Sequence, residues 1–395
     1  MLRLHSFRRL RRNVSRKGTV MKKVIVMIVA FVSLAGLEPW AVSGEVGRYV
    51  VLPVKNPEYH PNELFRAFDD FHNPRIRKLR TRYGLDEVVA AETDEWKRIL
   101  LLRHWLWSNI RIDNHHPTQT QLETFAILDA ALKGGRFHCT HFSIVQQAVL
   151  NSYGYVTRRL GCGPGLKDNG GHHGVNEVWV NKFRKWVLVD AKYDLHFEKD
   201  GLPLSALQIR DEIWKDGGKS VVRCFGLKGM PSTNQYPEKF GPNTTTYRWC
   251  SWEVNTNRFT AFPAAFGSVL VMYEDDIFRK NTWYRDGKPH WAYNTPYLIT
   301  TTRRDWIEWT PNVVKSKVEL KGDGATVLLT SFTPNFHSYQ VKCGEGPWVD
   351  CEDRVELPRR KALNRFTFRA VNLFGVAGPE HGVEIDWKSG VKAIR

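Results

Sequence analysis

Cys139, His173 and Asp190 have side chains of the types that carry out nucleophilic acyl transfer, and they follow one another in that order. A thiol becomes a strong nucleophile near neutral pH when a base accepts its proton, and a carboxylate orients that base. We therefore expect a Cys-His-Asp catalytic triad, working without a metal or an organic cofactor.

The surroundings of Cys139 decide whether this thiol can be reactive, because a single cysteine in a helix is more often a small buried apolar residue. Gly134 and Gly135 precede it, so the chain can bend sharply into the helix that we expect Cys139 to open. The first turn of a helix carries a partial positive charge that favours thiolate. The pattern of residues thus favours an activated nucleophile.

His173 and Asp190 stand at the start and the end of two neighbouring strand patterns. Residues 175–180 and 186–190 are strand-like, and a polar turn separates them. Such a hairpin would place both residues at its end away from the turn. His172 is the competing base, although it points to the opposite strand face. Asp194 and His196 are further rivals close by, and we assign no role to the two other histidines that flank Cys139, His138 and His141.

Helical periodicity supports these expectations. Trp96, Ile99, Leu102 and Leu106 recur at spacings of three and four and predict a helix over 93–110, with Thr93 as its N-cap. A second helix is predicted over 122–132, and a third from Cys139, with Gly154 beyond its end.

Three motifs resemble those of the transglutaminase-like superfamily. The run 134–142, followed by 154–158, resembles its nucleophile helix and next strand; 173–179, with Glu177 four residues after His173, resembles its His segment; and 186–190 resembles its Asp strand. The resemblance covers about residues 93–210. It implies a papain-like α+β core with Cys139 as nucleophile, His173 as general base and acid, and Asp190 as orienting carboxylate. Two positions depart from the family pattern, Val175 in place of an aromatic residue and Ala191 in place of a proline.

An acyl-transfer site also needs donors for the oxyanion. The backbone N–H of Cys139 is the first candidate. The family's second donor is a side chain upstream of the cysteine, for which Asn114, Gln119 and Gln121 are candidates.

The N-terminus predicts export. Nine Lys or Arg residues and no acidic residue occupy the first 23 positions, and the uncharged stretch 24–37 and the small residues 41–44 follow. This is typical of a signal peptide cleaved near Ser43 or Gly44. A signal peptide that began at Met21 would be more typical than one that began at Met1, so the position of the start residue stays open. The formal charge of +17 falls to about +9 without this segment, which requires no nucleic-acid partner.

The rest of the chain differs in character. Residues 240–309 hold 16 aromatic residues, twice the density of the whole chain, and predict irregular β structure. Residues 312–388 hold six short strand patterns separated by turn signals, which predict an antiparallel sandwich. Within it, 364–378 resembles the closing strands of fibronectin type III or immunoglobulin-like modules.

Six cysteines in an exported chain raise the question of disulfides. With Cys139 catalytic, at most two bridges can form. Cys343 with Cys351 is the simplest pair, because a short Gly-Pro turn separates them, and Cys224 with Cys250 is a second candidate; the connectivity stays open.

These observations divide the chain into a signal peptide (1–44), a catalytic domain (45–215), an aromatic-rich β extension (216–311) and a sandwich (312–395). We expect a secreted, periplasmic or surface-exposed enzyme that acts on a protein or peptide, or on cell-wall or glycan material, without a lasting membrane anchor. The alternative is a non-catalytic binding or adhesion protein that uses the same scaffold, with peptide or glycan bound by the aromatic-rich region.

Overall fold

The computed structural model describes residues 47–163, 172–227, 244–259, 269–281, 284–285, 288–289, 298–321, 324–358 and 362–389. Residues 46–395 form one compact unit. The predicted signal peptide lies outside the described residues. Within the described ranges, no helix is both long and apolar enough to cross a bilayer.

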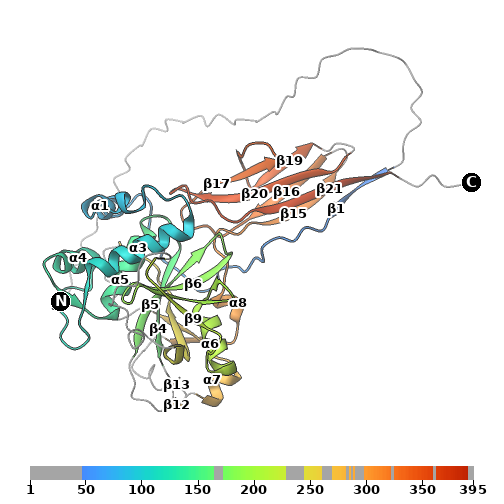
Figure 1. Cartoon of the computed structure of the whole chain (residues 1–395). Helices are drawn as coiled ribbons and strands as arrows, with labels where there is room; N and C mark the ends of the chain where they lie inside the picture. Colours follow the sequence, from blue (N-terminus) through green and yellow to red (C-terminus); the bar gives the residue numbers. More distant parts are fainter. Residues whose placement is uncertain are drawn as a thin grey trace, which may run out of the picture. The chain divides into compact units, whose positions relative to one another are not determined.

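The chain has an α+β fold, as the sequence predicted (Figure 1). The helices are α1 (Pro74–Arg82), α2 (Leu85–Val89), α3 (Glu95–Asn109), α4 (Thr124–Leu132), α5 (Cys139–Asn151), α6 (Ala206–Asp216), the 3-10 helix η1 (Thr244–Tyr247), α7 (Asp276–Asn281) and α8 (Arg304–Ile307). The strands before the C-terminal sandwich are β1 (Gly47–Leu52), β2 (Arg111–Ile112), β3 (Arg136–Phe137), β4 (Thr157–Gly163), β5 (His173–Val180), β6 (Lys185–Asp190), β7 (Leu195–Lys199), β8 (Leu202–Pro203), β9 (Val222–Phe225), β10 (Trp249–Glu253), β11 (Leu270–Tyr273), β12 (Tyr284–Arg285), β13 (Lys288–Pro289) and β14 (Leu298–Thr301).

One nine-stranded sheet organises the site. Its order is β14-β11-β10-β4-β5-β6-β7-β8, and β9 pairs with β7. Strands β5 and β6 form the predicted antiparallel hairpin, with Val178 opposite Val187. The aromatic-rich segment supplies β10, β11 and β14, so it extends the same sheet that carries His173 and Asp190.

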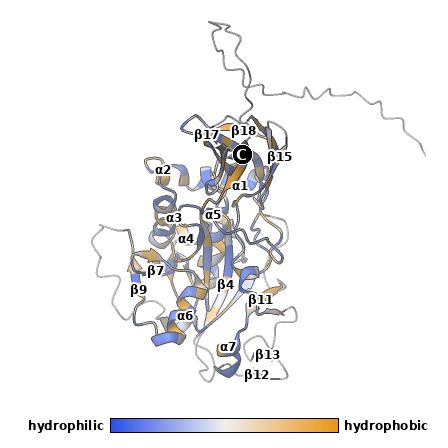
Figure 2. Ribbon diagram, turned by 90° about the vertical axis from the view of Figure 1, so that its right-hand side faces the viewer, coloured by the Kyte–Doolittle hydropathy of each residue, from blue (hydrophilic) through white to orange (hydrophobic). Residues whose placement is uncertain are grey.

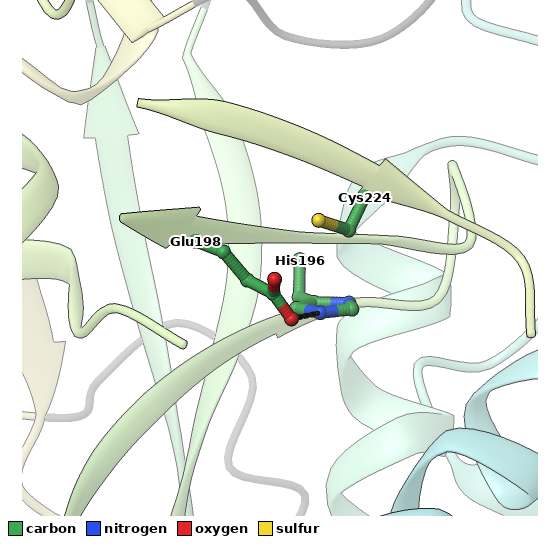
Figure 3. Close-up of side chains that lie close together, drawn as sticks. All are labelled: His196, Glu198 and Cys224. Carbon is green, nitrogen blue, oxygen red and sulfur yellow. Dashed lines mark hydrogen bonds and ion pairs between the residues drawn. The ribbon is translucent and has the colours of Figure 1, made fainter. Parts of the chain in front are cut away.

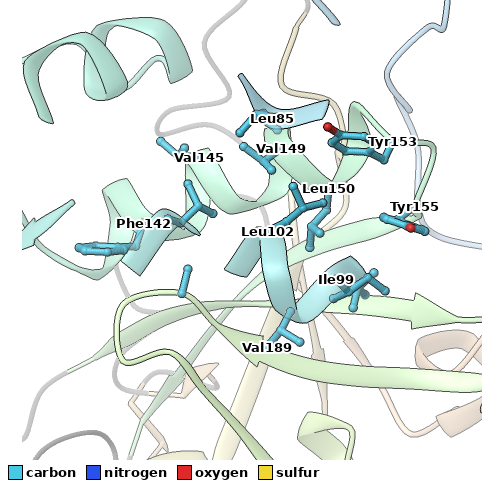
Figure 4. Close-up of a cluster of buried hydrophobic side chains, with 14 of the residues drawn as sticks. Leu85, Ile99, Leu102, Phe142, Val145, Val149, Leu150, Tyr153, Tyr155 and Val189 are labelled. Carbon is cyan, nitrogen blue, oxygen red and sulfur yellow. The ribbon is translucent and has the colours of Figure 1, made fainter. Parts of the chain in front are cut away.

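Alternation along the hairpin divides its side chains between two cores. Val178, Val180, Val187 and Val189 pack with apolar residues of α3 and α5 (Figure 4). Trp179, Trp186 and Leu188 face the other side, where they pack with α6. Helix α6 shows both hydrophilic and hydrophobic colours in Figure 2, as expected for an amphipathic helix with one buried face. The sheet is thus buried on both faces, which holds the hairpin rigidly.

Helix α3 begins one residue later than predicted. Asp94, not Thr93, is the N-cap, and its Oδ1 accepts the backbone N–H of Lys97 at 3.0 Å. A carboxylate at this position also interacts favourably with the helix dipole. Helix α4 likewise begins at Thr124 rather than Leu122, with Glu123 as its cap.

The C-terminal strands form two sheets. They are β15 (Lys315–Lys321), β16 (Gly324–Thr330), β17 (Phe336–Cys343), β18 (Val349–Cys351), β19 (Arg354–Pro358), β20 (Asn364–Asn372) and β21 (His381–Ser389). All six strand patterns predicted here are strands. One sheet has the order β15-β16-β19, and the other has the order β1-β21-β20-β17-β18. The N-terminal strand β1 therefore pairs with β21 at the far end of the described chain, a pairing that no local pattern predicts.

Candidate active site

Helix α5 presents Cys139 as its first residue, as the sequence predicted. The two glycines before it make the bend: Gly134 has a φ of +90°, and a Cβ on Gly135 would come within 2.7 Å of the carbonyl oxygen of Ala130. The chain therefore turns tightly out of α4 and enters α5 with the cysteine at the positive end of the helix.

His173 and Asp190 meet at the end of the β5–β6 hairpin away from its turn. Nε2 of His173 lies 2.6 Å from Oδ2 of Asp190, and both side chains are buried. The other carboxylate oxygen, Oδ1, accepts the backbone N–H groups of Lys192 and Tyr193 at 2.9 and 3.4 Å. Asp190 is thus held by its own turn and points one oxygen at the imidazole.

Cys139 and His173 each shift the pKa of the other, and Asp190 contacts the same imidazole, so the three predicted residues lie close together. Burial by itself raises the pKa of Cys139, but hydrogen bonds from His138 and His173 outweigh it and lower the pKa to about 4. Burial by itself lowers the pKa of His173, yet Asp190 and the thiol raise it to about 9. Between these values the pair is a thiolate beside an imidazolium, the form that attacks carbonyl carbon.

His138 is a residue that the sequence reasoning left without a role. It is the N-cap of α5, and its Nδ1 accepts the backbone N–H of Thr140 at 3.3 Å. With Nδ1 accepting, Nε2 is the ring nitrogen left to donate, and His138 contributes to the lowered pKa of the Cys139 thiol. A histidine directly before the cysteine was the available signal, but only the structure shows that it caps α5 and acts on the thiol.

The start of β5 packs directly against the first turn of α5. A Cβ on Gly174 would stand 3.8 Å from the backbone of Thr140 and 3.6 Å from Oγ of Ser143. The backbone N–H of Gly174 also contributes to the lowered pKa of Cys139. This close approach brings His173 next to the nucleophile.

A second contact joins α5 to the strand of the carboxylate. Oε1 of Gln146, two turns after Cys139, accepts the backbone N–H of Ala191 at 3.1 Å, and Gln146 is buried. Helix α5, which begins with Cys139, and the end of β6 are therefore tied together beside the three candidate residues.

The carboxylate of Glu177 anchors β5, the strand that carries His173, to elements other than α5. Its Oε2 accepts two hydrogen bonds from Arg158, at 2.7 and 3.0 Å, and one from Nε1 of Trp252 at 2.7 Å. Its Oε1 accepts the backbone N–H of Ala206, the first residue of α6, at 2.7 Å. The carboxylate thus joins β5 to β4, β10 and α6, and this structural role accounts for a glutamate at this position.

The rival residues make other contacts. His172 precedes β5, is exposed and stacks on Trp249 with the ring centroids 6.4 Å apart. Asp194 accepts from Arg103 at 2.7 Å and contacts His104 at 2.5 Å. His196 accepts from the same arginine, so Asp194 and His196 belong to a separate network centred on Arg103.

The three candidates for the second oxyanion donor are loop residues. Gln119 and Gln121 are exposed, and the amide of Gln119 donates to the carbonyl of Pro117. Asn114 accepts a hydrogen bond at 2.6 Å from Nζ of Lys192, which lies two residues after Asp190. His138 is a further candidate, since it acts directly on the thiol of Cys139 and lowers its pKa.

His196, Glu198 and Cys224 are grouped like metal ligands, with their ligand atoms within 4.8 Å of one another (Figure 3). Nδ1 of His196 accepts a hydrogen bond from Arg103 at 2.9 Å, so the ring proton lies on Nε2 and donates to Glu198 at 2.9 Å. A metal ion bound at Nε2 of His196 would need a lone pair on that nitrogen, and it would lie near the positive charge of the Arg103 guanidinium. In this structure His196 therefore links Arg103 to Glu198 by hydrogen bonds, and Cys224 lies beside them.

Both predicted disulfides are wrong, and all six cysteines are thiols in the structure. Cys351 stands opposite Tyr339, so Cys343 lies four residues further along β17, about 13 Å away at the rise of a strand. Cys224 is on β9 and Cys250 on β10, and four strands lie between them in the sheet. Both separations exceed the limit of about 7 Å between bridged Cα atoms.

The described aromatic residues of 240–309 are mainly core residues. Six of them are almost fully buried: Tyr247, Trp249, Trp252, Phe259, Phe278 and Trp309. Trp309, for example, packs edge-on against Trp186 of β6 and Phe332. Their density is explained by packing.

The sequence was also compared with known proteins. No protein-family model and no curated protein matches the chain.

Proposed function

We propose that this protein is an exported cysteine enzyme that attacks an amide or carboxamide carbonyl and forms a thioester on Cys139. The observation that carries the proposal is the series of Cys139, His173 and Asp190: His138 and His173 lower the pKa of the thiol to about 4, and Nε2 of His173 lies 2.6 Å from the carboxylate of Asp190. The resemblance of the three motifs to the transglutaminase-like superfamily supports it independently. A scaffold that only binds has no need of such a series.

The chemistry follows from the placement of the groups. The thiolate attacks the carbonyl carbon, and the imidazolium of His173 gives its proton to the departing amine or ammonia. Neutral imidazole then removes a proton from the acceptor, which attacks the thioester, and Asp190 stabilises the imidazolium throughout. The backbone N–H of Cys139 and the Nε2–H of His138 are our candidates for holding the oxyanion.

Water is the acceptor we propose, since water is always present and an amine must be specifically bound. The reaction would then be hydrolysis of an amide in a protein or peptide. A lysine amine as acceptor would instead make the protein a crosslinking transglutaminase.

The test uses the mature chain with a glutaminyl peptide and a primary amine, measuring ammonia release and amine incorporation separately. Cys139→Ala should abolish both, His173→Ala should be nearly as severe, and Asp190→Asn should cost about 10² to 10⁴-fold. His172→Ala, at the exposed neighbouring position, is the matched control and should retain most activity. Full activity in Cys139→Ala would refute the enzyme, and ammonia release without amine incorporation would identify the hydrolase.

A further inference from the structure

Two cysteines that the sequence did not pair stand directly opposite each other in the main sheet. Cys162 of β4 and Cys250 of β10 are register partners in an antiparallel pair. Opposite residues in such pairs have Cα atoms about 4.5 to 5.5 Å apart and point to the same face of the sheet. That separation lies inside the range of about 4.4 to 6.8 Å found for disulfides.

The register that pairs them is firmly held by the neighbouring residues. Gly163 and Trp249 are also partners, and a Cβ on Gly163 would come within 2.5 Å of the indole ring, so the ring occupies the space that the glycine leaves. A slip by one residue would drive that ring against a side chain and move both sulfurs to the other face. The strand register therefore keeps the two cysteines opposite each other in this sheet.

Both sulfurs are shielded from water. Cys162 is fully buried and Cys250 is 2% exposed, and both lie in the apolar core that contains Trp252 and Val175. Cys162 also lies opposite His173 on its other side and donates its S–H to the carbonyl of that residue at 3.4 Å. The pair thus adjoins the strand that carries the proposed base.

We propose that Cys162 and Cys250 form a disulfide when the chain folds in an oxidising compartment. The oxidant is a disulfide in a protein or in a small molecule. The thiolate of one cysteine attacks it and releases a first thiol. The second cysteine then attacks the mixed disulfide and releases a second thiol, and both cysteines lose their protons. The exchange takes place before the sheet closes, because the folded core admits no partner. The bond then joins β10 to β4 across a long segment of chain.

The test compares full-length protein secreted through an oxidising compartment with protein made in a reducing cytosol. Each sample is unfolded in the presence of an alkylating reagent, digested without reduction and mapped by mass spectrometry. The secreted sample should contain a linked Cys162–Cys250 peptide, and the cytosolic sample should contain both cysteines alkylated. Finding both alkylated in the secreted protein would overturn the proposal, whatever other pair is linked.

Stability provides an independent measurement. Cys250→Ala should lower the thermal unfolding midpoint of the secreted protein by about 5 to 10 °C and leave that of the cytosolic protein changed by much less. An equal loss in both samples would mean that the substitution acts only through core packing and would also contradict the bond. Neither measurement involves acyl transfer, so this proposal can fail without the proposed function failing.

Discussion

Two imidazoles approach the sulfur of Cys139 from different elements, His138 from the turn before α5 and His173 from β5. The second is held by Asp190 and its pKa is raised to about 9, whereas the first accepts a helix N–H. A thiol beside a charged imidazole is ionised without losing its partner for proton transfer.

The first residue-scale prediction concerns pH. The pKa of the thiol is lowered, so thiolate persists down to about pH 4 and is lost below it. The pKa of His173 is raised, so imidazolium persists up to about pH 9 and is lost above it. Acyl transfer should therefore show a plateau between these values and fall on both sides.

Alkylation measures the ionisation of the Cys139 thiol without requiring catalysis, so it tests the acid side of this pH profile separately. Iodoacetamide at pH 6 should label Cys139 faster than the exposed Cys343. His173→Ala should move the midpoint of the labelling profile back toward the ordinary thiol value of about 8.5. Equal labelling of the two cysteines at pH 6 would contradict the activation of Cys139.

The second residue-scale prediction separates the two roles of His138. Asparagine is a good N-cap, so His138→Asn should keep α5 intact but lose the donor to the sulfur. The alkylation midpoint of Cys139 should rise by about one unit, and acyl transfer should slow. His172→Ala is the control and should leave the midpoint unchanged. A wild-type midpoint in His138→Asn would mean that this histidine only caps the helix.

At the scale of elements, the buried ion pair of Glu177 with Arg158 joins three strands and α6. Both side chains are 1% exposed, and the guanidinium lies 3.9 Å from the ring centroid of Trp186. Burial lowers the pKa of Arg158, and the carboxylate of Glu177 opposes that effect. Removing one member of such a pair leaves an uncompensated charge in the core.

We therefore predict that Glu177→Gln lowers the free energy of unfolding by about 3 to 5 kcal/mol, measured by urea denaturation. The matched control is Glu384→Gln, which breaks the exposed pair with Arg365 and should cost less than about 1 kcal/mol. If both substitutions cost the same small amount, the carboxylate of Glu177 is not required to hold the strands together.

At the scale of the whole molecule, the end of α5 touches the C-terminal sandwich. The carbonyl of Gly154 accepts from Asn372 at 3.0 Å, and a Cβ on Gly154 would come within 2.5 Å of Phe374. Asn335 makes a second connection, since it donates to the carbonyl of Asp69 at 2.9 Å. Helix α5, which begins with Cys139, is thus linked to a module far along the chain.

Gly154→Ala should destabilise the protein through both its φ of +79° and the collision with Phe374. Gly344→Ala is the control, since Gly344 has a φ of +54° but open space around a Cβ, and should cost only the backbone strain of about 1 to 2 kcal/mol. Calorimetry should show the larger loss for Gly154→Ala, and the double variant Gly154→Ala/Phe374→Ala should recover part of it. Equal losses would indicate that the contact contributes nothing.

The sequence by itself determined the local elements and the identity of the three candidate catalytic residues. Apolar spacing predicted the body of α3, the glycines before Cys139 predicted the start of α5, and alternation predicted the β5–β6 hairpin. These features depend on residues within one or two turns of each other, so a short window contains their cause. The α+β class followed from the same patterns.

Only the tertiary structure decided which distant segments meet. The pairing of β1 with β21, the position of β10 beside β4, and the replacement of both predicted cysteine pairs by Cys162 opposite Cys250 all depend on strand order and register. So does the effect of His138 on the pKa of the thiol, which depends on the bend into α5. Register is chosen by packing across the sheet, as with Trp249 over Gly163, and residues that pack together there carry no common signal in the linear sequence.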